Sequence, residues 1–260
     1  MEDREKRREE RRGWVKMMSE HVKPGTIVEY GCGSGLVLEI LSARFPASMI
    51  VGVDRCRERL AEVVEKNLEN VVLVEADISH TIFADGAADS ALFVASLHEV
   101  YSHLGGQKVD EAFSMAHEVL KEDGILLIQD FLKPFPQPVE IVPRNEQTLQ
   151  RFLRFSNEFR PREVRYRRER RGLLLDIADA VEFISKYRSP TEEDWNEEMT
   201  ETHFFFTEEE YVRAAQNAGF TVQASKTLVH SERWWEENRE DIEFEFEPRY
   251  AWIQLILKKI

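Results

Sequence analysis

The sequence predicts an α/β fold: a doubly wound, mostly parallel, seven-stranded sheet with flanking helices and a helical insertion after the fifth strand. First, short apolar segments rich in β-branched residues alternate with segments of helical periodicity through the first half of the chain. Second, glycines or polar residues follow directly where these segments end. Third, the alternation stops near residue 132 and resumes near residue 207. The seven expected strands are 26–30, 49–53, 71–74, 90–94, 125–128, 220–224 and 252–257.

Helical periodicity fills the intervals between these strands. An N-terminal helix is expected at 3–22, where Pro24-Gly25 follows and ends it. The pattern of apolar residues predicts further helices at 36–45, 57–68, 107–121 and 207–218. Gly124 is expected to cap the helix at 107–121, and Thr207 with Glu210 has the spacing of a capping box at the start of the last helix.

The stretch 134–202 is expected to be a helical insertion on a core domain formed by 1–133 and 203–260. Prolines at 134, 136 and 138 cannot donate hydrogen bonds to a sheet, so they end the fifth strand. Amphipathic helices are expected near 146–159 and 174–187. Between residues 151 and 171 the chain carries nine arginines and three glutamates, a basic segment in an otherwise acidic protein.

Composition excludes several classes of protein. The chain has 42% hydrophobic residues, enough for a buried core, and no apolar run reaches the roughly 20 residues of a membrane-spanning helix. Its charged N-terminus lacks the apolar stretch of a signal peptide. A formal net charge of −14 disfavours a general nucleic-acid binder, and Cys32 and Cys56 provide no disulfide framework. We therefore expect a cytoplasmic protein with no membrane association; a homo-oligomer is compatible with the sequence.

A glycine-rich loop, Gly31-Cys32-Gly33-Ser34-Gly35, lies between the first expected strand and the helix that follows. Glycines permit a tight turn there and let a nucleoside or phosphate approach the backbone closely. A dinucleotide-binding loop would carry its third small residue at position 36, where this chain has Leu36. The carboxylate of Glu29, directly before the loop, would repel a pyrophosphate but suits a ligand with a cationic group.

In these motifs the sequence resembles the class I S-adenosylmethionine-dependent methyltransferases of the small-molecule type. The resemblance covers the core at 26–130 and the closing strands. It implies that Glu29 binds the cationic amino-acid end of the cofactor, Asp54 the ribose hydroxyls and Asp77 the adenine amino group, with Ala95-Ser96 beside the methionine part. The implied cofactor-binding residues are Glu29, Tyr30, Gly31, Cys32, Gly33, Gly35, Asp54, Arg55, Ala76, Asp77, Ile78, Ala95 and Ser96.

Methyl transfer to oxygen or nitrogen can require a base that removes a proton from the acceptor. His98 follows the fourth expected strand and titrates near neutral pH, so it is the first candidate catalytic residue, and Asp130 at the end of the fifth strand is another. Glu99, Tyr101 and His103 are weaker candidates on the same segment. No metal site is expected, since His98 and His103, five positions apart, do not share a helix face.

Several functions stay open at this point. The resemblance implies methyl transfer to an O or N atom of a small acceptor, with 134–202 as a lid over the acceptor site. The arginines of 151–171 suit an anionic acceptor, or they pair with the acidic stretches 192–210 and 232–247. The alternatives are an RNA or tRNA methyltransferase, a catalytically silent subunit that binds S-adenosylmethionine, and a NAD(P)-dependent oxidoreductase.

Overall fold

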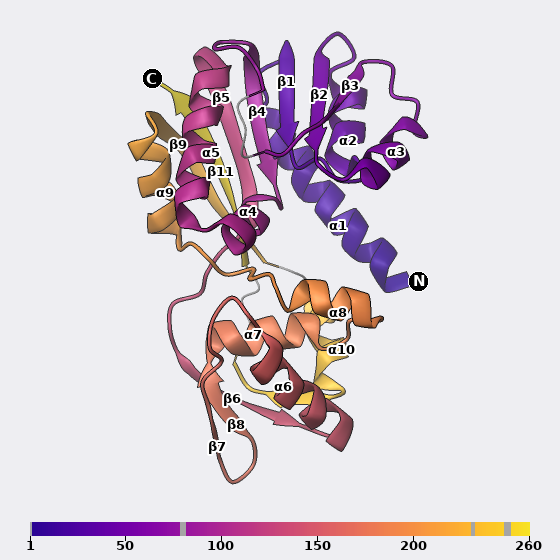
Figure 1. The fold of residues 1–260 in the computed structure, drawn as a ribbon, viewed down its shortest axis with the longest axis vertical. Helices are drawn as coiled ribbons and strands as arrows, with labels where there is room; N and C mark the ends of the chain where they lie inside the picture. Colours follow the sequence, from indigo (N-terminus) through magenta and orange to yellow (C-terminus); the bar gives the residue numbers. More distant parts are fainter. Residues whose placement is uncertain (1, 79–81, 230–231, 247–250) are drawn as a thin grey trace.

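A computed structural model describes residues 2–78, 82–229, 232–246 and 251–260; the side chains of 2–8 and 232–235 lie outside the described part. The chain forms a large sheet domain and a small subdomain beneath the lower end of the sheet (Figure 1). The large sheet has the order β3-β2-β1-β4-β5-β11-β9, and within its described strands every antiparallel pair involves β11. The expected doubly wound, mostly parallel, seven-stranded sheet is therefore confirmed. Its strands are β1 (Thr26–Tyr30), β2 (Met49–Asp54), β3 (Val71–Glu75), β4 (Ala88–Val94), β5 (Leu120–Phe131), β9 (Phe220–Val229) and β11 (Ala251–Lys259).

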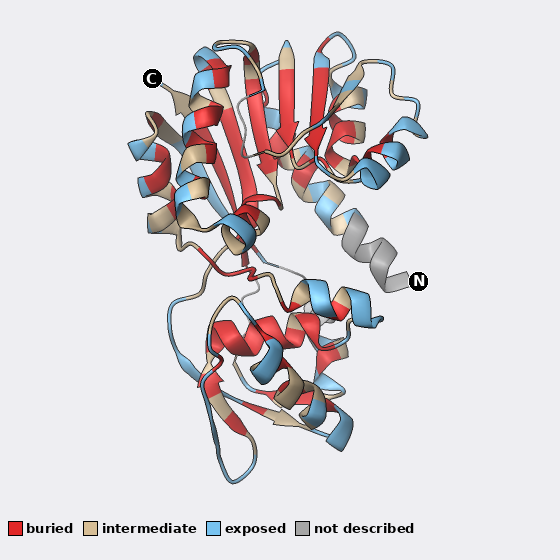
Figure 2. Ribbon diagram, viewed as in Figure 1, coloured by how far each residue is buried: buried red, intermediate tan, exposed pale blue. Residues whose placement is uncertain are grey.

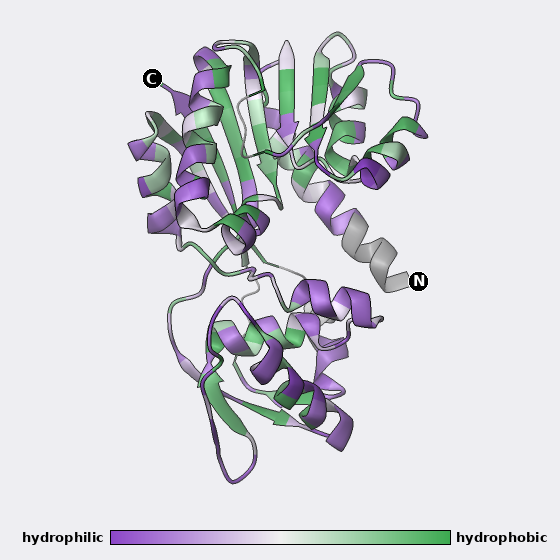
Figure 3. Ribbon diagram, viewed as in Figure 1, coloured by the Kyte–Doolittle hydropathy of each residue, from purple (hydrophilic) through white to green (hydrophobic). Residues whose placement is uncertain are grey.

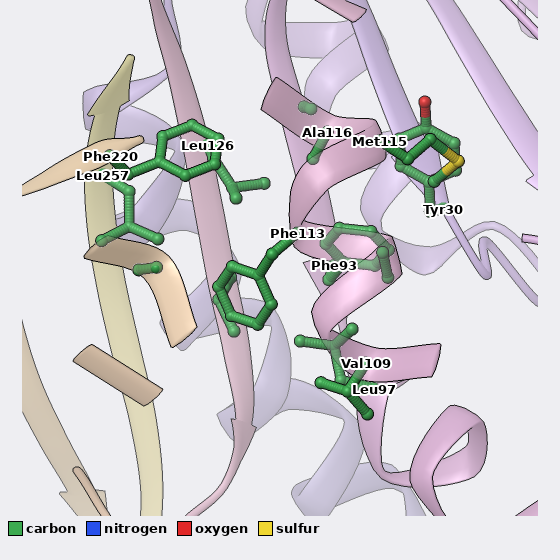
Figure 4. Close-up of a cluster of buried hydrophobic side chains, with 14 of the residues drawn as sticks. Tyr30, Phe93, Leu97, Val109, Phe113, Met115, Ala116, Leu126, Phe220 and Leu257 are labelled. Atoms are coloured by element: carbon green, nitrogen blue, oxygen red, sulfur yellow. The ribbon is translucent and has the colours of Figure 1, made fainter. Parts of the chain in front are cut away.

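Helices cover both faces of the sheet, because alternate side chains of its strands are apolar on both sides. One face packs against α1 (Glu2–Met18), α2 (Leu36–Arg44) and α3 (Arg57–Val64), with the short 3₁₀ turn η1 (Ser19–His21) after α1. The other packs against α4 (Leu97–Leu104), α5 (Gly106–Val119) and α9 (Glu208–Asn217). Figure 4 shows this second core, in which Phe113 of α5 lies against the strands near Phe93 and Leu126. The central strands are buried and largely hydrophobic along their length (Figures 2 and 3).

The two helix caps expected from the sequence have different outcomes. The capping box of Thr207 and Glu210 forms at the start of α9. The expected cap at Gly124 is wrong, because α5 ends at Val119 and Gly124 lies within β5. The reason is tertiary: Leu120 is already extended and pairs with Ala88 of β4, so strand pairing begins four residues before the glycine.

The insertion contains the two expected helices, α6 (Glu146–Glu158) and α7 (Ile177–Lys186), but it is not purely helical. It also holds an unpredicted antiparallel sheet of order β10-β6-β8-β7. The strand β10 comes from the part of the chain that we assigned to the core, so part of 203–260 folds with the insertion. We call residues 138–204 and 232–246 the small subdomain. Its other elements are β6 (Pro138–Pro143), β7 (Tyr166–Arg168), β8 (Leu173–Asp176), α8 (Glu192–Glu198), α10 (Glu232–Arg239) and β10 (Ile242–Phe244).

A buried polar cluster ties the small subdomain to the segment that leads back to the sheet domain. Lys186, 1% exposed, donates to the carboxylate of Glu198 at 2.7 Å and to the backbone carbonyls of Glu198 and Glu201. Glu182, fully buried, accepts from the Thr202 hydroxyl at 2.6 Å and from the His203 amide at 2.9 Å. Since both charged groups are hydrogen-bonded, the cluster holds the backbone of 198–203 in one place.

Five of the nine arginines of 151–171 form ion pairs with described residues of the chain: Arg154, Arg162, Arg165, Arg167 and Arg171. Arg154 binds Glu192 at 2.7 Å and Arg171 binds Glu243 at 2.9 Å, so the expected pairing with the two acidic stretches occurs. Residue 247 and the side chains of 232–235, in the second stretch, lie outside the described part. Arg162 binds the buried Asp179 at 2.7 Å, whereas Arg165 and Arg167 only reach a glutamate two residues away. Among the described helices, none is both long and apolar enough to cross a membrane.

We predict that Arg162→Gln lowers the free energy of unfolding by about 1–3 kcal/mol, the scale for leaving a buried hydrogen-bonding group without its partner. Replacing Arg165, Arg167 and Arg168 together by Gln should leave the free energy of unfolding nearly unchanged, because exposed ion pairs contribute little to stability. Urea unfolding of the two variants measures both. If the triple variant is as destabilised as Arg162→Gln, the outer arginines have a structural role that these contacts do not show.

Candidate functional site

The glycine loop after β1 has a backbone that only glycine adopts easily. Gly31, Gly33 and Gly35 have φ angles of 76°, 49° and 77°, and the amides of Gly31 and Cys32 bond the Val53 carbonyl at the end of β2. A Cβ on Gly31 would lie 2.6 Å from the Ser96 side chain, whereas a Cβ on Gly33 would meet nothing within 4 Å. At Gly31 the loop is therefore packed against the turn that follows β4, and at Gly33 it leaves open space that a ligand could occupy.

Asp54, at the end of β2, holds this loop in place. One carboxylate oxygen accepts from the Gly33 amide at 2.7 Å and the other from the Cys56 amide at 2.8 Å. Each oxygen has a second lone pair, so the carboxylate can also accept from two hydroxyls of a ligand. The side chain thus has a structural role, and its remaining lone pairs leave the expected ribose contact possible.

Glu29 is 2% exposed, and its Oε2 atom has no hydrogen-bond partner in the described part of the chain. Burial, and then the nearby charge of Asp54, raise its pKa well above the ordinary range. A buried carboxylate oxygen without a donor is costly unless a ligand supplies one. The position fits the ammonium group of S-adenosylmethionine.

These residues line one cavity of about 920 Å³ between the carboxyl ends of the strands and the small subdomain. Three of the expected cofactor residues do not line it. Tyr30 stacks on Phe93 at 5.1 Å and Gly35 packs against Val63. Ala76 packs against the core and donates its amide to the Asp54 carbonyl. The expected residues that line the cavity are Glu29, Gly31, Cys32, Gly33, Asp54, Arg55, Asp77, Ile78, Ala95, Ser96 and His98.

The turn after β4 is strained where it meets the cavity. Ala95 has a φ of 54°, which is uncommon for a residue with a side chain, and its amide bonds the Gln129 carbonyl of β5. The hydroxyl of Ser96, 3% exposed, has no partner in the described part. Strained backbone of this kind is typical of ligand-binding turns.

His98 and Asp130 form a buried pair below this turn. His98 Nδ1 lies 2.8 Å from Asp130 Oδ1, and the other carboxylate oxygen accepts from the amides of Leu97 and His98 at 2.8 and 3.2 Å. Asp130 does not itself line the cavity, whereas His98 does. A carboxylate only accepts, so Nδ1 carries the hydrogen and Nε2 is the ring atom left for a ligand.

The pKa of His98 reflects two opposing effects. Burial lowers it, but the charge and hydrogen bond of Asp130 outweigh burial, so that the pKa lies above the ordinary value of 6.5. The ring is also fixed by Phe131, which meets it edge-on at a centroid distance of 4.9 Å. The pair can therefore hold a proton taken from a ligand in the cavity.

Of the three weaker catalytic candidates on α4, two line the cavity and one does not. Glu99 and His103 line the cavity, and His103 Nε2 lies 3.0 Å from Glu201 Oε1. Tyr101 packs against Phe205 at 5.3 Å and is not among the lining residues. Among the described residues, no group of three or more His, Cys, Asp or Glu side chains is arranged to hold a metal ion.

Several lining residues were not found from the sequence. Phe131 immediately follows Asp130 and could have been inferred from its place at a strand end. Others carry no motif. Gln129 lies on β5 next to Asp130, and further examples come from the small subdomain, the N-terminal helix and β11: Arg11, Glu197, Glu198, Glu201, His203 and Trp252.

Residues 4–225 of the chain match the protein family described as Methyltransferase domain. The chain belongs to this methyltransferase family. The resemblance to class I S-adenosylmethionine-dependent methyltransferases that the motifs suggested is thereby confirmed. The match includes most of the small subdomain.

Individual curated relatives match the chain over shorter stretches. Trans-aconitate 2-methyltransferase of Acidovorax sp. (strain JS42) is 34% identical over 110 residues, which is 42% of this chain and 39% of the relative. Malonyl-[acyl-carrier protein] O-methyltransferase of Geobacter sulfurreducens is 27% identical over 112 residues, also 39% of its length. The matches thus span about two fifths of each relative.

Solved structures of S-adenosylmethionine-dependent methyltransferases share the fold over nearly the whole chain. One from Mesorhizobium loti has a TM-score of 0.59 at 16% identity and covers 95% of this chain and 96% of its own. One from Methanosarcina mazei has a TM-score of 0.55 at 15% identity, covering 94% and 97%.

We predict that Asp54→Ala weakens binding of S-adenosylhomocysteine by about 1.5–3 kcal/mol, the scale for losing hydrogen bonds to a charged group. Isothermal titration of the folded variant measures this. Asp85→Ala, which removes an exposed carboxylate remote from the cavity, is the matched control and should leave affinity unchanged. Unaltered affinity in Asp54→Ala would remove the ribose assignment.

Proposed function

We propose that this protein transfers a methyl group from S-adenosylmethionine to an O or N atom of a small acceptor. The observation that carries this proposal is the His98–Asp130 pair, which presents one free imidazole nitrogen to the same cavity as the glycine loop. Family membership supports the cofactor and the reaction class. The relatives named for trans-aconitate and for malonyl-[acyl-carrier protein] support methylation of acceptors other than nucleic acid.

The cofactor's parts have matching groups in the cavity. Glu29 would bind its ammonium, Asp54 its ribose hydroxyls, Asp77 its adenine, and Ala95-Ser96 its methionine part. When bound, S-adenosylmethionine supplies an electrophilic methyl carbon, and the electron pair of the broken sulfur–carbon bond stays on sulfur. Among the residues expected from the sequence, Tyr30, Gly35 and Ala76 act only by shaping this side of the cavity.

His98 then acts on the acceptor. As the acceptor's O or N atom bonds to the methyl carbon, the hydrogen that it carried passes to Nε2 of His98. Asp130 is a positioning residue: it fixes the tautomer and orients the ring, and its negative charge stabilises the imidazolium that results. Phe131 and Trp252 line the same end of the cavity and exclude water from it.

The geometry favours a small acceptor over RNA. Residues of the small subdomain line part of the cavity, whose volume of about 920 Å³ lies in the size range of pockets for small ligands. The arginines of 151–171, the basic feature that could have bound RNA or an anionic acceptor, are not among the residues that line it in the described part of the chain. The hypothesis of an anionic acceptor therefore loses the observation on which it rested.

Mass spectrometry tests the proposal. A cell extract incubated with the enzyme and S-adenosylmethionine carrying an isotopically labelled methyl group should yield a small labelled product. With His98→Ala the rate should fall by about 100-fold or more, the usual loss for a general base, while cofactor affinity is retained. His21→Ala, an exposed histidine outside the cavity, is the control.

Other outcomes identify the alternatives. Label in RNA would favour the RNA methyltransferase. Cofactor binding with no labelled product in any fraction would favour a silent subunit, and a His98→Ala rate within a few-fold of wild type would leave His98 with a structural role only.

A further inference from the structure

The half of the cavity that faces away from the glycine loop has an acidic wall. We call it the acceptor half; α4, residues 197–203 and the ends of β5 and β11 form it, with α1 alongside. Its acidic side chains are Glu99, Glu197, Glu198 and Glu201. Among the described lining residues, the arginines near this half are Arg59 and Arg11, whose guanidinium lies over the Trp252 ring at 5.3 Å. An acceptor in this half therefore meets an excess of negative charge.

Two of these acids already have cationic or imidazole partners. Glu198 is bound by Lys186 at 2.7 Å, and Glu201 contacts His103 at 3.0 Å. Glu197 is exposed at the rim. Glu99 is different, since it lies one residue from His98 in the first turn of α4 and is partly buried.

No residue of the described chain hydrogen-bonds or ion-pairs with the carboxylate of Glu99. Burial is the main cause that raises its pKa, and the negative charges of Glu201 and Asp130 raise it further. His98 and Arg59 lower it through their charge, but neither contacts it closely enough for an ion pair. A carboxylate held among other carboxylates at a cavity wall is stabilised when a ligand brings a positive charge.

A second observation points to a ligand at the same place. His98 is only 6% exposed, its Nδ1 is bound to Asp130, and its Nε2 has no hydrogen-bond partner among the described residues. This nitrogen and the Glu99 carboxylate come from consecutive residues at one wall. A ligand that satisfies both must offer two donors: one hydrogen to the imidazole and a cationic nitrogen to the carboxylate.

We propose that the acceptor is a small amine, whose protonated nitrogen binds Glu99 while a neighbouring hydroxyl or amine hydrogen faces Nε2 of His98. This inference rests on the proposed function and names its substrate class. The aromatic rings of Phe131 and Trp252, 4.0 Å apart at the end of β5 and β11, provide an apolar surface for the body of such a molecule. A carboxylate acceptor would instead face Glu99 and its acidic neighbours with like charge.

Two matched probes test this in the full chain. With S-adenosylhomocysteine saturating, isothermal titration should show binding of benzylamine and at least tenfold weaker or no binding of benzoate, which has the same ring with the opposite charge. Glu99→Gln, which keeps the shape and removes the charge, should weaken benzylamine at least tenfold without changing the affinity for S-adenosylhomocysteine. Glu193→Gln, on the exposed side of α8 and outside the cavity, should change neither.

The labelled product of the extract assay gives a second readout. A labelled product retained by a cation exchanger at neutral pH supports the amine; one retained by an anion exchanger overturns it. Equal binding of benzoate and benzylamine, or benzylamine binding that is unaffected by Glu99→Gln, also overturns it. If S-adenosylhomocysteine itself fails to bind, the proposed function fails, which is a separate result.

Discussion

The carboxylate of Asp130 connects the two halves of the site. At the end of β5 it accepts hydrogen bonds from the amides of Leu97, His98 and Phe131 and from the His98 ring. These contacts fix where α4 begins, how the strained turn at Ala95 leaves β4, and which imidazole nitrogen faces the cavity. A buried acceptor with all its bonds satisfied is rigid, so the proposed base is held ready before any acceptor arrives.

In our proposal, different parts of the chain around this carboxylate bind the cofactor and the acceptor. The cofactor side consists of strand ends and the glycine loop, which the core of the sheet holds rigidly. The acceptor side consists of α4 and the segment 197–203, whose backbone depends on the buried Glu182 and Lys186. Because the acceptor wall is supported by the small subdomain, changes there can alter which acceptor binds without altering the cofactor site.

Features that depend on short stretches of sequence, such as the residues at strand ends, could be predicted. Strand ends in a parallel sheet meet at one edge, so Glu29, Asp54, Asp77 and His98 could be placed together before the structure was known. The sheet of the small subdomain was missed because β10 pairs with β6 from a position about 100 residues away, and nothing local in Ile242–Phe244 indicates that partner. The sequence left open whether the arginines of 151–171 bind an acceptor or pair with acidic residues, because tertiary packing determines their partners. His203 and Glu201 gained significance only when the cavity showed what they face.

The most direct test of this account is a nitrogen-15 NMR titration of the His98 imidazole. We predict the tautomer with hydrogen on Nδ1 and a bare Nε2, and a pKa above 6.5 because the Asp130 carboxylate stabilises the charged ring despite its burial. In Asp130→Asn the pKa should fall, since the charge that raises it is gone. A ring with hydrogen on Nε2 at high pH, or a pKa that Asp130→Asn leaves unchanged, would contradict the assignment of His98 as the base that Asp130 positions.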